Sequence, residues 1–462
     1  MNYLKTFLAI SLSVAVLPVK GGGIITNTNQ STAWVRSQAR GASQEIDAVY
    51  FNPAGLTGLN QGLNLSVNSQ TILSKKTVES NYATLNNKYY KGDITVPVFP
   101  TIYAAYNTGK WAFSAGINPI GGGGEAIFKH GLPSFEMGVS NLKTLLNAYG
   151  VTDYSSNIYF KGSSVDYGFQ LGASYKANQT LSFFIGGRYV YAINQYNGYL
   201  KDNTLIFNNN TKLSASAFFT NAGDPISATL LGDQDADVKQ TGSGFAPILG
   251  ANVTLLGNKL NIGLKYEFLT KITVKNDTKK DLKVAYNSSN STYITQFPDK
   301  AETAADIPAL LAIGASYKVS EKLSASAGLH YYFDKNADFG WTHNGTHASN
   351  KDIIKDNNFE LMTGIEYKLS SKFLVSAGYT LSKVGVNPEY NSDFAFGLTS
   401  NTVGIGGKLN LSPKVAFNLG ASYTYYNPSD KNYTSTINVP VKETYGRDVW
   451  IIGIGLDFNL GK

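Results

Sequence analysis

The sequence predicts an all-β fold: a transmembrane antiparallel up-and-down β-barrel of about fourteen strands, with an N-terminal hatch plugging the lumen. Three observations support this prediction. Apolar residues alternate with small or polar ones at a period of two. Short turns alternate with long polar segments. The composition combines 46 Gly and 30 Tyr with a mean hydropathy of only -0.14, as a wall with one lipid face and one lumen face would give.

The clearest strand pattern runs from Val415 to Tyr425, where apolar and aromatic residues occupy odd positions and small or polar residues even ones. The segments 165–175, 323–333 and 373–381 repeat it. Each has about ten residues, enough for a tilted strand to cross the hydrocarbon core. We expect strands near 62–76, 98–107, 110–120, 158–176, 180–199, 241–255, 259–276, 305–318, 322–334, 356–368, 372–384, 396–410, 414–427 and 447–460.

The connections between these strands are of two kinds. The short turns lie at 106–110, 175–179, 256–259, 317–322, 367–372 and 411–414. The long polar connections include 77–97, 129–157, 200–240, 277–304 and 334–355. In outer-membrane barrels short turns are periplasmic and long loops are extracellular. The sequence therefore predicts a multi-pass outer-membrane protein with both ends of the chain on the periplasmic side.

The first residues read as an export signal. Lys5 precedes the apolar stretch from Phe7 to Val19, which is too short to span a bilayer. We expect a signal peptide at 1–21, with a short N-terminal anchor as the alternative. The division that follows is signal peptide 1–21, hatch 22–60 and barrel 61–462.

Several classes of protein are disfavoured by composition. The absence of Cys excludes a disulfide scaffold, a thiolate metal site and a lipidated Cys anchor. The net charge of +7 is spread over scattered basic residues, so nucleic-acid binding has little support. No constellation typical of catalysis, metal ligation or cofactor binding stands out. We therefore expect neither an enzyme nor a cofactor.

The N-terminal segment carries a resemblance to a known family. The stretches Gly22 to Ala42 and Asp47 to Leu56 resemble the hatch of the FadL/TodX family, whose Asn-Pro-Ala element falls at Asn52, Pro53 and Ala54. The resemblance is strong over this segment. Over the barrel it is limited to strand number, turn placement and overall length. It implies an outer-membrane transporter of long-chain fatty acids or other hydrophobic molecules. Cargo would be captured at the outer loops, bound in the lumen and released sideways near a kinked third strand.

The third expected strand ends in a sequence that disfavours regular pairing. Pro119 lacks a ladder donor, and the run Gly121, Gly122, Gly123 and Gly124 readily adopts bulged or positive-φ conformations. We therefore expect a break here, where the resemblance places a lateral opening. The alternative is a flexible strand end that leads into the outer loop.

Candidate ligand contacts lie in the next loop and on the lumen face. The loop candidates are the apolar residues Phe128, Leu132, Phe135, Met137, Leu142, Leu145 and Leu146. Residues 140–149 have helical spacing, and their apolar face either receives cargo or packs on neighbouring loops. Arg188 and Lys265 could pair with a carboxylate headgroup, or with acids of the lumen itself.

Two rival functions share the barrel. A general diffusion porin would have an open lumen with charged constriction residues, and a surface adhesin would act through its long loops. We expect the protein to interact with hydrophobic small molecules and membrane lipid and not with nucleic acid. We also expect the chain to be a monomer. The run from Gly455 to Leu460 resembles the final-strand signal for the barrel-assembly machinery, although the chain ends in Leu-Gly-Lys and not in an aromatic residue.

Overall fold

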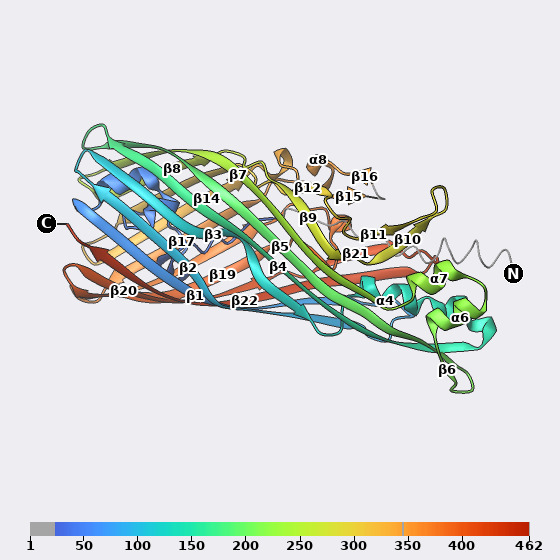
Figure 1. Ribbon diagram of the computed structural model, residues 1–462. Helices are drawn as coiled ribbons and strands as arrows, with labels where there is room; N and C mark the ends of the chain where they lie inside the picture. The colour runs from blue at the N-terminus through green and yellow to red at the C-terminus, as the bar shows by residue number, and fades with distance from the viewer. Residues whose placement is uncertain (1–23, 344–345, 462) are drawn as a thin grey trace.

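The computed structural model describes residues 24–343 and 346–461, so the expected signal peptide lies outside the described residues. Over these residues, 14 antiparallel strands close into a barrel, which confirms the predicted fold class (Figure 1). The first and last strands pair to complete it. The barrel strands are β1 Gly62–Ser80, β2 Tyr89–Asn107, β3 Trp111–Phe128, β4 Val151–Lys176, β5 Leu181–Phe207, β7 Gln234–Leu255, β8 Leu260–Glu267, β13 Leu310–Lys318, β14 Leu323–Tyr332, β17 Phe359–Lys368, β18 Phe373–Lys383, β19 Ser400–Ser412, β20 Val415–Tyr426 and β22 Pro440–Asn459.

Shorter strands extend the wall or form hairpins beyond it. The extensions in the main sheet are β6 Lys212–Ser214, β9 Thr273–Lys280, β12 Glu302–Ala304 and β21 Ser429–Thr434. Separate hairpins pair β10 Lys283–Asn287 with β11 Thr292–Thr295, and β15 Thr342–His343 with β16 Thr346–His347. Several strands are therefore longer than predicted. The segment 77–97, expected as a loop, is mostly paired strand because polar residues also form ladders outside the lipid.

One expected strand, 259–276, is divided. β8 ends at Glu267 and β9 begins at Thr273. The neighbouring segments carry Pro247 and Pro308, which have no N–H to donate to a ladder. Between β8 and β9 an isolated bridge joins Thr270 to Ile307, and single backbone hydrogen bonds run from Phe268 to Pro247 and from Ala305 to Ile272.

The two faces of the wall follow the alternation in the sequence. On β1, Asn64 and Asn68 are buried on the inside, whereas Val67 and Leu73 are exposed outside. Exposed apolar residues recur on the outer face of the other barrel strands, which gives the continuous apolar band of a membrane-spanning barrel. This architecture is that of a multi-pass outer-membrane protein.

Aromatic side chains gather near the short turns. The rings of Trp111 and Tyr175 lie 4.7 Å apart, and Trp111 is exposed on the outer face. Tyr106, Tyr367 and Phe373 are likewise exposed beside such turns. Amphipathic rings beside the short turns, at one end of the barrel wall, suit the membrane–water interface.

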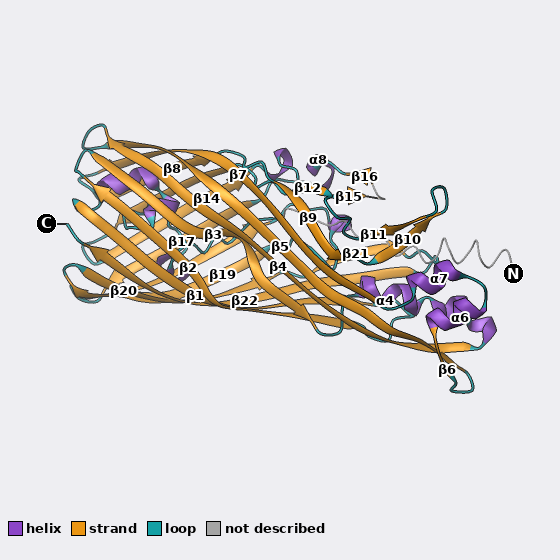
Figure 2. Ribbon diagram, in the orientation of Figure 1, coloured by secondary structure: helices purple, strands orange, loops and turns teal. Residues whose placement is uncertain are grey.

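The helices lie at the two ends of the barrel (Figure 2). Inside the end that carries the short turns are α2 Thr32–Arg36, α3 Ala48–Phe51 and the 3-10 helix η1 Pro53–Gly58. At the other end are α4 Pro133–Ser140, α5 Leu142–Leu145, η2 Asn147–Tyr149, α6 Ala215–Asn221, α7 Pro225–Leu230, η3 Asp334–Asn336, α8 Asn350–Ile353 and η4 Pro388–Tyr390. None of the helices in the described ranges is long and apolar enough to cross a membrane.

The N-terminal segment, residues 24–60, contacts the inner wall at backbone distance. A Cβ atom placed on Gly314 of β13 would lie 2.3 Å from the carbonyl carbon of Gly41. One placed on Gly420 of β20 would lie 3.0 Å from the nitrogen of Arg36. The wall therefore needs glycine at these positions for the segment to occupy the lumen.

Candidate functional site

An ion-pair network joins the N-terminal segment to the wall. The fully buried Arg36 donates to Glu366 of β17 at 2.5 Å and to Ser376 of β18 at 2.9 Å. Glu45 accepts from Arg40 at 2.6 Å and from Lys408 of β19 at 2.8 Å. Each buried cation thus has a carboxylate partner, which is the condition for placing charge in a low-dielectric interior.

The pKa of Glu45 predicts how this network responds to acid. Burial opposes ionisation, but Lys408, Arg40 and Arg36 outweigh it and hold the pKa of Glu45 well below its ordinary value. Such a carboxyl contributes stability that is present above its unfolded pKa of about 4.3 and is lost as pH falls through the lower, folded pKa. We expect planar-bilayer conductance to stay low from pH 7 to about pH 5 and to rise only in stronger acid. Conductance reports whether the N-terminal segment still fills the lumen. A midpoint for the rise in conductance above pH 5 would contradict the lowered pKa of Glu45.

The Asn-Pro-Ala element docks onto three strands. Asn52 donates to the carbonyl of Ser43 at 2.9 Å and to Asn252 of β7 at 2.7 Å. The carbonyl of Pro53 accepts from Ser174 of β4, and that of Ala54 from Ser182 of β5, each at 2.7 Å. The Asn52 amide and the carbonyls of Pro53 and Ala54 thus bond directly to polar side chains of the wall.

Arg188 and Lys265 are brought together, but around an acid of the lumen itself. Arg188 makes two bonds to Glu267, at 2.7 and 3.0 Å, and Lys265 approaches the same carboxylate at 2.5 Å. Both cations also lie over the ring of Tyr50, at 4.7 and 4.5 Å from its centroid. The alternative of pairing within the lumen is therefore what the structure shows, and contact of these cations with a ligand stays a prediction.

An apolar cluster lines the lumen on the outer side of this ion cluster. On β5 the inward residues that follow Arg188 are Val190 and Ala192, both buried. We call the wall residues that join them the apolar lumen cluster: Ile72, Ile120, Val190, Ala192, Ile272, Val274, Ala305, Val449 and Ile451. They pack with Val49 and Tyr50 of the N-terminal segment. An apolar lumen of this kind suits an apolar cargo better than water.

The wall next to this cluster is interrupted. β2 and β3 pair at Ile94–Ala126 and again at Ile102–Ile117, with no ladder pairs between. On the other side of β3, pairing with β4 shifts register after Pro119 and after Gly122. Gly122 and Gly124 have φ of +90° and +77°, a region that glycine adopts without strain.

The strand continues past the glycines to Phe128. The glycine run therefore lies inside the third strand, which stays paired with β4 across it, and not at the end of the strand. An opening of the wall at this place stays a prediction. Ile120 belongs to the apolar lumen cluster, and Ile25 lies within 3.2 Å of a Cβ placed on Gly121. The interruption thus borders both the lumen and the N-terminal segment.

Two residues of this interruption were not among the sequence candidates. Pro97 and Pro100 of β2 fall in the unpaired stretch and supply no backbone N–H. The signal was present in the motif Pro97-Val98-Phe99-Pro100, since Pro is excluded from the interior of a paired strand.

The loop candidates do not form an exposed apolar surface. Leu142 and Leu146 are fully buried in a cluster that includes Phe219 and Leu231 of the neighbouring loop, with Leu145 packed beside them. Phe128, Leu132 and Phe135 are buried in another. Met137 packs on a third, around Tyr82 and Tyr90. Of the two alternatives for these apolar residues, packing on neighbouring loops is what the structure shows. Contact of these residues with cargo stays a prediction.

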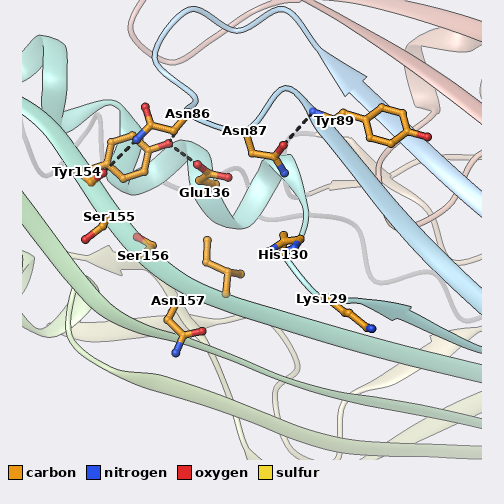
Figure 3. Close-up of a pocket in the computed structure, with 11 residues that line it drawn as sticks. Asn86, Asn87, Tyr89, Lys129, His130, Glu136, Tyr154, Ser155, Ser156 and Asn157 are labelled. Atoms are coloured by element: carbon orange, nitrogen blue, oxygen red, sulfur yellow. Dashed lines mark hydrogen bonds between the residues drawn. The ribbon is translucent and has the colours of Figure 1, made fainter.

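A cavity of about 540 Å³ opens among these loops, as Figure 3 shows. Its lining includes Lys129, His130 and Glu136, together with Asn and Ser side chains. Glu136 accepts hydrogen bonds from Tyr90, at 2.6 Å, and from Tyr154. Tyr89 and Ile158 also line it, so the cavity mixes charged, amide and apolar groups and is not the largely apolar pocket that an apolar cargo favours.

A closed barrel of 14 strands, with a segment folded inside it and an interrupted ladder between the second and third strands, is a FadL/TodX-type fold. Comparison with solved structures agrees. A FadL homologue of Pseudomonas aeruginosa has 14% identity and a TM-score of 0.62, over 95% of this chain and 99% of that one. The P. putida toluene transporter TodX has 14% identity and a TM-score of 0.55, over 90% and 94%. The Ralstonia pickettii toluene transporter TbuX has 17% identity and a TM-score of 0.52, over 90% and 94%. No protein-family model matches the sequence, and a search of curated proteins found no relative.

Proposed function

We propose that this chain carries hydrophobic molecules across the outer membrane, through the lumen and out sideways between β2 and β3. The observation that carries the proposal is the meeting of the apolar lumen cluster with the wall interruption at Ile120. Burial of an alkyl chain contributes about 0.8 kcal/mol per CH2. Release into lipid then keeps the cargo out of water throughout.

In this proposal residues 22–60 act as a hatch. The described part of the segment is joined to the wall by Arg36, Arg40, Asn52 and Lys265. A seated hatch prevents small solutes from crossing, and the exit at Pro119 and Gly121–Gly124 borders the hatch at Ile25. The names of the structural neighbours, toluene transporters and a FadL homologue, support this class of cargo.

The test compares uptake of labelled long-chain fatty acid and of a labelled small sugar by cells that express the protein. Saturable fatty-acid uptake above empty cells, without sugar entry, is expected. Val190→Asn places an amide in the apolar lumen cluster and should lower fatty-acid uptake roughly tenfold, as loss of about 1.5 kcal/mol of burial implies.

The matched control is Ser74→Ala, a buried lumenal substitution that leaves the apolar cluster intact. Sugar entry through the unaltered protein, with fatty-acid uptake at the background level, would identify a diffusion porin and overturn the proposal. Uptake of neither, with cell attachment lost on deletion of the gene, would favour an adhesin.

A further inference from the structure

The third barrel strand ends before its neighbours, which leaves a gap in the outer rim of the wall. The last residue of β3, Phe128, is the register partner of Gly92 on β2 and of Phe160 on β4. Beyond this level β2 extends to Tyr89 and β4 extends to Val151. Within the described part of the chain, no strand lies between these two ends. The gap is therefore in the same part of the wall as the interruption between β2 and β3, but closer to the outer end.

Helix α4 closes the inner side of this gap. Glu136 of α4 accepts a hydrogen bond from Tyr90 of β2 at 2.6 Å and another from Tyr154 of β4. All three side chains are buried. One carboxylate thus joins the two strands where β3 no longer separates them. Tyr89, the neighbour of Tyr90 on β2, is exposed on the opposite face by the alternation of the strand.

The cavity of about 540 Å³ lies in front of Glu136, and three parts of the chain line it. The β1–β2 connection supplies Asn86 and Asn87, the β3–β4 loop supplies Lys129 and His130, and β4 supplies residues 155–158. Figure 3 shows Asn87 across the cavity from Asn157. The buried members of the lining form its floor and the exposed members its mouth, so the cavity is blind toward the lumen and open to the outside.

Several polar side chains of this lining have hydrogen-bonding capacity that the protein does not use. Over the described residues, the side chains of Ser155 and Asn157 make no hydrogen bond, and those of Lys129 and His130 make neither a hydrogen bond nor an ion pair. The Asn87 side chain accepts from the backbone of Tyr89 at 3.2 Å, which leaves its N–H groups available.

These unused groups match the chemistry of a sugar. An amide presents donors and an acceptor close together, and a hydroxyl can do both. Neighbouring hydroxyl groups on a sugar ring both donate and accept, so they can bond to such groups from two sides of the cavity at once. Ile158 on the floor adds a small apolar surface for the C–H groups of the ring. An apolar cargo would leave most of these polar groups unpaired.

The height of the cavity agrees with this class of ligand. Toward the outer end of β2, Val98 is the last exposed aliphatic residue, and Lys91 and Asp93 beyond it form an exposed ion pair. At about 3.3 Å per residue and a tilt of about 40°, Tyr89 lies roughly 20 Å beyond Val98. In a Gram-negative outer membrane this zone holds the saccharide part of the outer-leaflet glycolipid. Its acidic groups complement Lys129 and His130 at the mouth.

We propose that this cavity binds a sugar unit of the core saccharide of the outer-leaflet glycolipid. The ligand would bridge Asn87 and Asn157, and so join the ends of β2 and β4 on the outer side as Glu136 joins them on the inner side. This site is separate from the proposed path of the cargo, since none of its residues belongs to the apolar lumen cluster or to the wall interruption.

The test is calorimetric titration of the full-length protein with three probes. They are the core oligosaccharide released from the lipopolysaccharide of the bacterium in which the protein occurs, neutral maltotriose, and inorganic phosphate. The protein is refolded, so that no glycolipid is carried over, in a polyoxyethylene detergent, which has no sugar head. The core oligosaccharide should bind at least about tenfold more tightly than maltotriose, because charge-assisted bonds add to those of the hydroxyls. Phosphate alone should not bind.

Variants connect the binding to this cavity. Asn87→Ala with Asn157→Ala should weaken binding of the oligosaccharide about tenfold or more, as loss of two hydrogen bonds implies. Ser155→Trp, which fills the mouth, should abolish it. The matched control is Asn209→Ala, an exposed amide of an outer loop that does not line the cavity. Fatty-acid uptake should be unchanged in all of these variants, so the result is independent of the proposed transport function.

Three results would overturn the inference. The first is that the oligosaccharide does not bind, or binds the Ser155→Trp variant as tightly as the unaltered protein. The second is that maltotriose binds as tightly as the oligosaccharide, which would make a soluble sugar the ligand and not the glycolipid. The third is that phosphate displaces the oligosaccharide completely, which would identify a simple anion site.

Discussion

A disulfide across the wall interruption should reduce fatty-acid uptake to near the background of empty cells. A Cβ placed on Gly124 lies 3.7 Å from the Cβ of Val96, within the range that a disulfide bridges. Val96→Cys with Gly124→Cys would therefore tie β3 to β2 at the outer edge of the unpaired stretch. Sideways passage requires the two strands to part, and the bond would prevent it.

The natural chain has no Cys, so the introduced thiols form a single possible pair. Reduction should restore uptake, and each single substitution should leave it largely intact, apart from about 1–2 kcal/mol of strain at the positive φ of Gly124. The matched control is Ala105→Cys with Ser114→Cys, which joins the same strands where they are already paired. Full uptake by the oxidised Val96/Gly124 variant would exclude exit through this part of the wall.

Neutralising Glu366 should release the hatch. Glu366 lies 2.5 Å from Arg36 and 3.6 Å from Arg40, so Glu366→Gln weakens the pairing of two buried guanidinium groups. Breaking a buried ion pair from one side typically costs about 3–5 kcal/mol. At the lower end of that range, the population with an unseated hatch should rise roughly a hundredfold. Planar-bilayer recordings should show frequent large openings that are rare in the unaltered protein.

A double-variant cycle separates this effect from general damage to the barrel. Glu366→Gln with Arg36→Met removes both charges and should close the channel again in part, because no buried charge at position 36 then remains. The control Glu321→Gln changes an exposed carboxyl in a short turn at the same end of the barrel. Openings as frequent in this control as in Glu366→Gln would contradict a specific anchoring role.

The strands and turns could be predicted from the sequence because each depends on residues that are close together in the chain. Each barrel strand faces lipid on one side, so a period of two appears within about ten residues. Prediction from the period of two failed in segments that do not face lipid. The outer ends of β1 and β2 pair in water as polar strands, and the segment after β8 breaks opposite Pro247 and Pro308.

The candidate site was predicted in part. Pro119 and the glycines marked the irregular pairing within the third strand, because backbone chemistry alone disfavours a regular ladder there. Pro97 and Pro100, which lie in the stretch of β2 without ladder pairs to β3, were missed. The burial of Leu142 and Leu146 depends on α6 and α7, more than sixty residues along the chain.

The sequence by itself determined the barrel, its strand count and the position of the irregular pairing in the third strand, because alternation, turns and missing backbone donors act over a few residues. The tertiary structure alone decided which charges meet. Closing the barrel sets Lys76 opposite Arg447, and folding the hatch inside sets Arg36 against Glu366. These pairs join distant parts of the chain, and no local pattern records them because ladder register and lumen packing are fixed only when the wall closes.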